Sequence, residues 1–143
     1  MSSPTRWINQ AAALAVKDGQ VCLVTSSSGR RWVIPKGMLE PGKSSGEIAV
    51  QEAWEEAGIV GRIQQTPIGT YQYAKYGGTC LVTVFLMQVT EVLEDWPERN
   101  VRTRVWLPPE EAIDLLEEPA LRDIVQQCFR DLEIFASDSG PTA

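Results

Sequence analysis

Two short apolar runs near the start of the chain are separated by a polar tetrapeptide. The runs are Ala11–Val16 and Val21–Thr25, and the linker between them has Asp18 and Gly19 at its centre. An Asp-Gly pair between two apolar runs favours a tight β-hairpin. The pattern therefore predicts that the fold begins with two antiparallel strands.

A third apolar run is followed by a loop and then by a helix with clear ends. Trp32–Ile34 is typical of a short strand, and Met38–Lys43 is a turn-rich loop. Ser44 and Glu47 have the S-x-x-E spacing of a capping box, which makes Ser44 the predicted N-cap. Gly58 stands where a helix C-terminus favours a left-handed residue. The pattern predicts one capped helix between these positions.

Turn residues and apolar runs alternate along the rest of the chain. The predicted elements are extended segments at Gly61–Thr66 and Ile68–Lys75, a long strand at Cys80–Val89, an acidic loop at Glu91–Asn100, a strand at Val101–Leu107 and helices at Pro109–Leu116 and Pro119–Phe135. The long apolar strand is typical of the middle of a sheet. Strands on both sides of one early helix, with further helices at the end, predict an α+β fold with a mixed sheet between helices.

Three glutamates share one face of the predicted capped helix. At about 100° of rotation per residue, Glu55 and Glu56 lie within roughly 60° and 40° of Glu52. Like charges at these spacings oppose each other by about 0.2 to 0.5 kcal/mol per pair, so we expect a cation on this face. Ordinary solvated glutamates are the alternative reading. The preceding strand and glycine-containing loop, together with the helix caps, favour a metal and phosphate site.

The segment around these glutamates resembles the signature of the Nudix hydrolases, G-x5-E-x7-R-E-U-x-E-E-x-G-U, where U is apolar. Here the segment reads GMLEPGKSSGEIAVQEAWEEAGI. The matching residues are Gly37, Glu52, Ala53, Glu55, Glu56, Gly58 and Ile59. Lys43 stands in place of the first glutamate of the signature, and Gln51 stands in place of its arginine. In the family these two side chains are expected to approach each other and steady the catalytic helix, so losing both charges is expected to be less damaging than losing one.

Three later stretches resemble the diphosphoinositol polyphosphate phosphohydrolase branch, whose members also cleave diadenosine polyphosphates. They are Val89–Trp96, Arg102–Trp106 and Glu110–Leu116. Matching stretches reach from about Ala11 to about Leu116. The resemblance implies a Nudix-type α/β/α sandwich with a mixed β-sheet and the glutamate helix against it. On that helix, Ile48, Val50 and Trp54 are expected to pack, not to bind ligand.

The resemblance also assigns roles to the glutamates. By position in the motif, Glu52 and Glu56, with the carbonyl oxygen of Lys36, correspond to ligands of Mg²⁺, with Mn²⁺ as an alternative ion. Oxygen atoms of this kind are the ligands that Mg²⁺ prefers. Glu55 corresponds to the proton acceptor, a role worth roughly 10²- to 10⁴-fold in rate. The roles of Glu55 and Glu56 can be exchanged.

Composition agrees with one small enzyme domain. The chain has 143 residues, of which 43% are hydrophobic, enough for one sizeable core. We expect a single domain over residues 1–136 and a disordered tail over 137–143. No apolar stretch is long enough to span a membrane, so we expect no membrane partner and a cytoplasmic location. Cys22, Cys80 and Cys128 lie among apolar neighbours and are expected to be buried, reduced thiols.

Charge and the missing histidine exclude several classes of function. The chain contains no histidine, which removes Ser-His and Cys-His nucleophiles, histidine-ligated zinc and an imidazole base. The net charge of -6 argues against a nucleic-acid partner, because such binding depends on basic surface. Carboxylate-held Mg²⁺ can still neutralise a small polyphosphate. The expected partner is therefore a small-molecule polyphosphate, bound by a monomer or a homodimer.

Hydroxyl and cationic side chains that flank strand ends, or lie in the R-x-R-x-W run, are the candidates for substrate binding. They are Ser28, Arg30, Lys75 and Arg102. For any one of them, a role in surface solubility explains the residue about as well. The animal inositol enzymes carry basic residues at the positions of Gln10 and Glu118, and their absence here favours a nucleoside or dinucleoside polyphosphate.

Two functions follow from these patterns. The first is a magnesium-dependent Nudix pyrophosphohydrolase that cleaves a phosphoanhydride bond in a nucleoside, dinucleoside or diphosphoinositol polyphosphate. The second is a Nudix-fold module that binds a nucleotide or polyphosphate with little turnover. Lys43 and Gln51 motivate the second function, because both depart from the signature.

Overall fold

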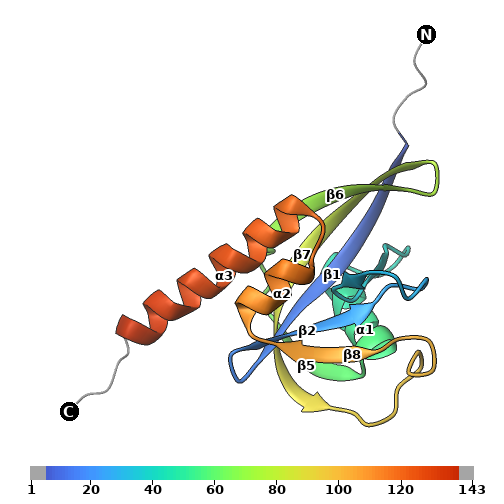
Figure 1. The fold of residues 1–143 in the computed structure, drawn as a ribbon. Coiled ribbons are helices and arrows are strands. Elements are labelled where there is room, and N and C mark those ends of the chain that lie inside the picture. Colours follow the sequence, from blue (N-terminus) through green and yellow to red (C-terminus); the bar gives the residue numbers. More distant parts are fainter. Residues whose placement is uncertain (1–5, 139–143) are drawn as a thin grey trace.

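A mixed sheet with helices on both faces forms the framework of the protein in a computed structural model that describes residues 6–138 (Figure 1). The strands are β1 (Trp7–Lys17), β2 (Gln20–Thr25), β3 (Trp32–Val33), β4 (Lys36–Met38), β5 (Ile59–Ile63), β6 (Gly69–Lys75), β7 (Gly78–Val92) and β8 (Arg104–Leu107). The helices are α1 (Ser45–Ala57), α2 (Pro109–Leu115) and α3 (Pro119–Asp138).

The sheet is built around the pair of its longest strands. Among the described strands, β1 and β7 run parallel, from Trp7 opposite Thr79 to Val16 opposite Gln88, and the other pairs are antiparallel. Strand β7 also pairs with β5 and β6, so the long apolar strand lies in the middle of the sheet, as predicted. The predicted mixed sheet is confirmed.

Alternation along β1 creates two hydrophobic cores, one on each face of the sheet. Ala11, Ala13 and Ala15 belong to the core under α1. Ala12 and Leu14 belong to the core under α2 and α3. Since successive side chains of a strand point to opposite faces, one alanine-rich strand serves both cores. Figure 1 shows α1 on one face of the sheet and α2 with α3 on the other, which confirms the predicted α/β/α sandwich.

The predicted hairpin and the predicted helix caps are both present. Asp18 and Gly19 have φ values of 51° and 74°, and a two-residue hairpin loop of type I′ requires positive φ at both of its residues. At the start of α1, the Ser44 hydroxyl accepts a hydrogen bond from the Glu47 N–H at 3.1 Å, and the Glu47 carboxylate accepts one from the Ser44 N–H at 3.1 Å. Gly58 ends the helix with φ 65°. Helix α1 is thus fixed at both ends.

Arg104 of β8 ties the C-terminus of α1 to the sheet. Its Nη1 donates hydrogen bonds to the carbonyl oxygens of Ala57 at 2.8 Å and Leu93 at 2.9 Å. The guanidinium also stacks over Trp96, at 4.3 Å from the ring centroid. A cation at this end of a helix is favourable for the helix dipole. Arg104 therefore holds the acidic helix in place.

Some boundaries differ from the prediction. Strand β4 was not expected, because it has three residues, follows Pro35 and contains Gly37. Its pairing with β1, and not a local propensity, makes it a strand. Strand β8 begins at Arg104 and not at Val101, because the N–H groups of Val101 and Arg102 donate to the Glu98 carbonyl in a turn.

The packing prediction for α1 was wrong at one position. Ile48 is fully buried and Val50 packs against the core beneath it, as expected. Trp54 is 44% exposed, so it does not pack against the sheet. Since Trp54 follows the buried Ala53 on the helix, its side chain points away from the sheet.

The remaining expectations concern the end of the chain and the thiols. Helix α3 continues to Asp138, beyond the predicted end near Phe135. The expected tail starts at residue 137, and its last five residues lie outside the described part of the chain. Cys22, Cys80 and Cys128 are buried and free, as predicted, and burial raises the pKa of Cys22 to about 12. None of the helices in the described residues combines the length and apolar character needed to cross a membrane.

Candidate active site

The acidic face of α1 meets the backbone of β4. Glu56 Oε1 accepts a hydrogen bond from the Lys36 N–H at 3.1 Å. The Glu52 carboxyl group lies against Gly37, where the Cβ of any other residue would collide with it. A larger residue at position 37 would therefore force the Glu52 side chain out of its present position. The structure brings Lys36, Glu52 and Glu56 together, as the motif implies.

Burial and repulsion from neighbouring carboxylates disfavour the charged forms of both glutamates. Burial, followed by the charges of Glu56 and Glu55, raises the pKa of Glu52 to about 8. Burial also raises the pKa of Glu56 to about 7, against the opposing effect of Arg102. A nearby positive charge favours the ionised form of a carboxyl group. Two such groups side by side are therefore suited to a hard divalent cation, which prefers oxygen ligands. Within the described residues, no three His, Cys, Asp or Glu side chains are grouped so that they could hold a metal ion.

Arg102 is the present partner of Glu56. Its Nη2 donates to Glu56 Oε2 at 2.9 Å, its Nε to Glu98 Oε1 at 2.9 Å, and its Nη1 to the Thr25 carbonyl oxygen at 2.9 Å. The side chain is 10% exposed. The predicted substrate-binding residue Arg102 is thus engaged by the acidic site and by β2.

Glu98 is a fourth carboxylate that sequence reasoning missed. Its charge contributes to the raised pKa of Glu52 and of Glu56. The backbone places it there, because the Glu98 N–H donates to the Glu55 carbonyl oxygen at 3.0 Å. The acidic loop between β7 and β8 was recognised from the sequence, but nothing in it distinguished Glu98 from its neighbours.

A chain of polar contacts leads to Glu55, the predicted proton acceptor. Gln51 Nε2 donates to Glu55 Oε1 at 3.2 Å. Lys43 Nζ donates to Gln51 Oε1 and lies 3.3 Å from Glu40 Oε2. An ammonium group only donates, so Gln51 turns its carbonyl oxygen to Lys43 and its NH₂ group to Glu55. The two residues that depart from the motif are therefore in contact.

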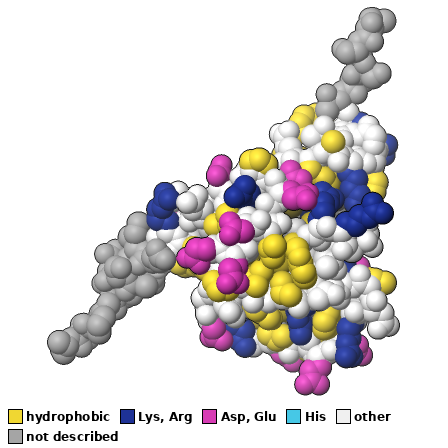
Figure 2. Space-filling view, viewed as in Figure 1, with side chains coloured by type: hydrophobic (Ala, Val, Ile, Leu, Met, Phe, Trp, Pro, Cys, Tyr) yellow, Lys and Arg dark blue, Asp and Glu magenta, His cyan; other side chains and the backbone are white. Residues whose placement is uncertain are grey.

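A hollow of about 170 Å³ opens beside Glu56 and is rich in cations. The charged and aromatic residues that line it, besides Glu56, are Arg31, Lys36, Lys75, Arg102, Tyr73 and Tyr76. We call it the cationic hollow. Guanidinium and ammonium groups in such numbers suit phosphate oxygens. Figure 2 shows dark blue Lys and Arg side chains adjoining magenta acidic ones on the face of the protein that carries α2 and α3.

The predicted substrate residues divide into two groups. Lys75 and Arg102 line the cationic hollow. Ser28 and Arg30 lie on the exposed β2–β3 loop and are not among the residues that line it. The neighbouring Arg31 lines it instead, and its N–H donates to the Ser26 hydroxyl at 3.2 Å.

Tyr73 is a further residue that sequence reasoning missed, and its partner is Gln10, which was considered only for the basic residue that it replaces. The Tyr73 hydroxyl donates to Gln10 Oε1 at 2.6 Å. Lys36 Nζ lies 5.3 Å from the centroid of the Tyr73 ring. Strand alternation could have found Tyr73, because it lies two residues from Lys75 and so on the same face of β6. Burial lowers the pKa of Lys36 to about 8, helped by the neighbouring cations and against the opposing charge of Glu56.

Comparison with known sequences identifies the family. The family model of the NUDIX domain matches residues 7–128. Nudix hydrolase 12, mitochondrial, from Arabidopsis thaliana is 34% identical over 122 residues, which cover 80% of this chain and 60% of that protein. Diphosphoinositol polyphosphate phosphohydrolase 3-alpha from Homo sapiens is 33% identical over 120 residues, which cover 80% of this chain and 72% of that protein. The chain spans about 60% of the length of the Arabidopsis relative.

Solved structures share the fold. The C. elegans Ap4A hydrolase superposes with a TM-score of 0.71 at 20% identity, over 89% of this chain and 99% of that chain. A NUDIX hydrolase from Nitrosomonas europaea gives a TM-score of 0.69 at 24% identity, over 90% of both chains. Together with the motif on α1 and the matched domain, these similarities show that the chain belongs to the Nudix hydrolase family.

Proposed function

We propose that the protein is a magnesium-dependent pyrophosphohydrolase that cleaves a phosphoanhydride bond in a nucleoside, dinucleoside or diphosphoinositol polyphosphate. The observation that carries the proposal is the pair of glutamates, Glu52 and Glu56, which meet the β4 backbone with raised pKa values, and of which Glu56 also lines the cationic hollow. The human relative is named for a diphosphoinositol polyphosphate and the C. elegans structure for Ap4A. Both names describe small polyphosphates.

Three groups would hold the metal ion. They are the carboxylates of Glu52 and Glu56 and the carbonyl oxygen of Lys36, with Mn²⁺ as an alternative to Mg²⁺. When bound, the ion would neutralise phosphate oxygens and lower the pKa of a water molecule. Gly37 supports this assignment, because its missing side chain leaves space for the Glu52 carboxylate at the β4 backbone.

The protein's own side chains would supply the remaining functions. Glu55 would accept a proton from the attacking water, and the amide of Gln51 would keep its carboxylate in place. Lys75 and Arg31 would hold phosphate oxygens in the cationic hollow. Arg102 would turn from Glu56 to phosphate once that carboxylate has another cationic partner.

Ser28 and Arg30 remain predicted contacts to the substrate from the β2–β3 loop. The loop is exposed at both residues, and Ser28 contacts the Ser26 hydroxyl at 3.1 Å. These contacts would lie at the edge of the cationic hollow, where Ser26 and Arg31 already contribute to its lining.

Product release from a substrate panel tests the proposal. The panel contains diadenosine polyphosphates, diphosphoinositol polyphosphates and nucleoside triphosphates, each with Mg²⁺, with Mn²⁺ and with a chelator. We expect turnover of at least one class that requires a divalent ion. Tight binding of panel members without turnover under either ion would contradict the proposed hydrolase activity and favour the second candidate function, a binding module. Lys43 and Gln51 are the residues that motivate this candidate.

A cytoplasmic location and a monomeric or homodimeric state complete the proposal. The Arabidopsis relatives named Nudix hydrolase 12 and Nudix hydrolase 16 are both called mitochondrial, so location needs its own measurement. Fluorescence imaging of the tagged chain in its own cell would decide between the two compartments. Light scattering at several concentrations would give the oligomeric state.

A further inference from the structure

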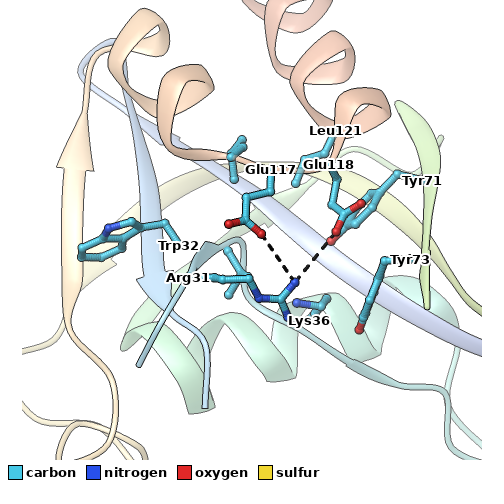
Figure 3. Close-up of a pocket in the computed structure, with 10 residues that line it drawn as sticks. Arg31, Trp32, Lys36, Tyr71, Tyr73, Glu117, Glu118 and Leu121 are labelled. Carbon is cyan, nitrogen blue, oxygen red and sulfur yellow. Dashed lines mark ion pairs between the residues drawn. The ribbon is translucent and has the colours of Figure 1, made fainter. Parts of the chain in front are cut away.

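Arg31 lies between the cationic hollow and two glutamates on the opposite side. Its Nη1 is 3.9 Å from Glu117 Oε2 and 3.9 Å from Glu118 Oε1. Both glutamates belong to the connection between α2 and α3, and Figure 3 shows them pointing at the guanidinium from the α3 side. Arg31 also lines a second, narrow hollow of about 20 Å³, which has room for about one water molecule. One arginine therefore borders two cavities and faces two acids.

The cations of the site differ in how strongly they are engaged. Arg102 is nearly buried and bound by Glu56 and Glu98 at 2.9 Å each. The side chain of Arg31 is 36% exposed, and its two acidic contacts are longer. Arg31 can therefore exchange partners more easily than Arg102. Glu117 and Glu118 compete with any phosphate that approaches it.

We propose that Glu117 and Glu118 are specificity determinants that limit how much negative charge the bound polyphosphate can carry. This inference rests on the proposed hydrolase function. The two carboxylates withhold Arg31 from phosphate and also repel anions that approach Arg31. Repulsion grows with each phosphate that a substrate adds, whereas the hold on Arg31 is the same for every substrate. Removing the two charges should therefore help the most highly charged substrates most.

The alternative is a pair of ordinary surface contacts. Exposed ion pairs are often worth little, and Glu117 has a side-chain exposure of 64%. Two features distinguish this pair from a solubility role. Both carboxylates face the same guanidinium nitrogen, and that arginine lines the cavity next to Glu56.

The test compares two double variants with the same charge change. Glu117→Gln with Glu118→Gln removes the acids at Arg31, and Glu110→Gln with Glu111→Gln removes two exposed acids of α2 as the control. Steady-state KM is measured for diadenosine substrates with three to six phosphates. We expect KM for the longest chain to fall about twofold to fivefold in the first variant, with little change for the shortest. An equal change at every length, or the same change in the control, overturns the inference.

Two further measurements separate this inference from the proposed function. Calorimetric binding of inorganic pyrophosphate and of inorganic tripolyphosphate needs no turnover, so it tests the charge limit even if the protein hydrolyses nothing. The first variant should gain more affinity for tripolyphosphate than for pyrophosphate. Adding Arg31→Ala should remove the part of the gain that is the same for both anions, because the glutamates withhold Arg31 equally from each, and should leave the extra gain for tripolyphosphate that comes from lost repulsion. An undiminished gain with Arg31→Ala overturns the part assigned to Arg31.

Discussion

Glu56 is subject to opposing influences on its charge. Burial raises its pKa, whereas Arg102 and the Lys36 N–H stabilise its ionised form. Glu56 Oε2 accepts a hydrogen bond from Arg102 at 2.9 Å, and Glu56 Oε1 accepts one from the Lys36 N–H at 3.1 Å. A buried carboxylate with partners on both oxygens stays in one orientation. It is therefore held in place before a metal ion or substrate binds.

Glu56→Gln tests the proposed metal ligand. The amide keeps the shape and can still accept one hydrogen bond, so the fold should survive, but it loses the negative charge. We expect activity to fall by about 100-fold or more, the size typical of losing one electrostatic group in an active site. Activity and circular dichroism are measured side by side. Glu94→Gln, at an exposed position of the β7–β8 loop, is the control and should keep the original rate. An unchanged rate for Glu56→Gln would mean that this face is not the metal site.

Gly37→Ala tests the contact between β4 and Glu52. The new methyl group would collide with the Glu52 carboxyl group, so one of them must move. Because the colliding group ends a flexible side chain, we expect a loss of only about 0.5 to 1.5 kcal/mol in the free energy of unfolding, the cost of a side chain forced off its preferred rotamer. Urea denaturation measures it. In a Glu52→Ala background the same substitution should cost much less, since the colliding group is gone. Equal costs in both backgrounds would place the strain elsewhere.

At the scale of elements, Lys43 and Gln51 link the β4–α1 loop to the helix. Lys43→Glu alone would place a carboxylate close to Glu40 and to the Gln51 carbonyl oxygen. Gln51→Arg alone would place two cations together. The double variant restores opposite charges, so we expect a favourable coupling of about 0.5 to 3 kcal/mol in the free energy of unfolding. Its hydrolysis rate should also exceed the rate calculated by multiplying the relative rates of the two single variants. Purely additive effects in this double-mutant cycle would rule out a coupled pair.

Elements whose signals are local could be predicted from the sequence. The Asp18-Gly19 hairpin and the Ser44 and Gly58 caps depend on a few adjacent residues, and all three are present. Strand β4 was missed because it forms only by pairing with β1, a distant part of the chain. The sequence predicts Arg30 as a contact but does not single out Arg31, because loop conformation decides which of two adjacent arginines faces the cationic hollow. The motif glutamates were found because helical geometry fixes their spacing.

At the scale of the whole molecule, the site joins parts of the chain that are far apart in sequence. The α1 helix supplies Glu52 and Glu56, β4 supplies Lys36, β6 supplies Lys75, and the loop before β8 supplies Arg102. These elements meet because β1 pairs with both β4 and β7, while β6 pairs with β7. Periodicity predicts such a sheet. It does not predict which connecting segment lies beside the cationic hollow. Here that segment is the connection between α2 and α3, which brings Glu117 and Glu118 to Arg31.

Mg²⁺ should stabilise the folded protein, because the unfolded chain does not hold the glutamates of α1 together. At a free ion concentration 100 times the dissociation constant, binding adds about 2.7 kcal/mol to the free energy of unfolding. For a chain of this length, we expect Tm to rise by about 5 to 10 °C in calorimetry. NaCl at the same ionic strength is the control for general screening, and Glu56→Gln should lose most of the rise while Glu94→Gln keeps it. A rise of the same size with NaCl, or in Glu56→Gln, would show that the ion acts elsewhere on the acidic surface.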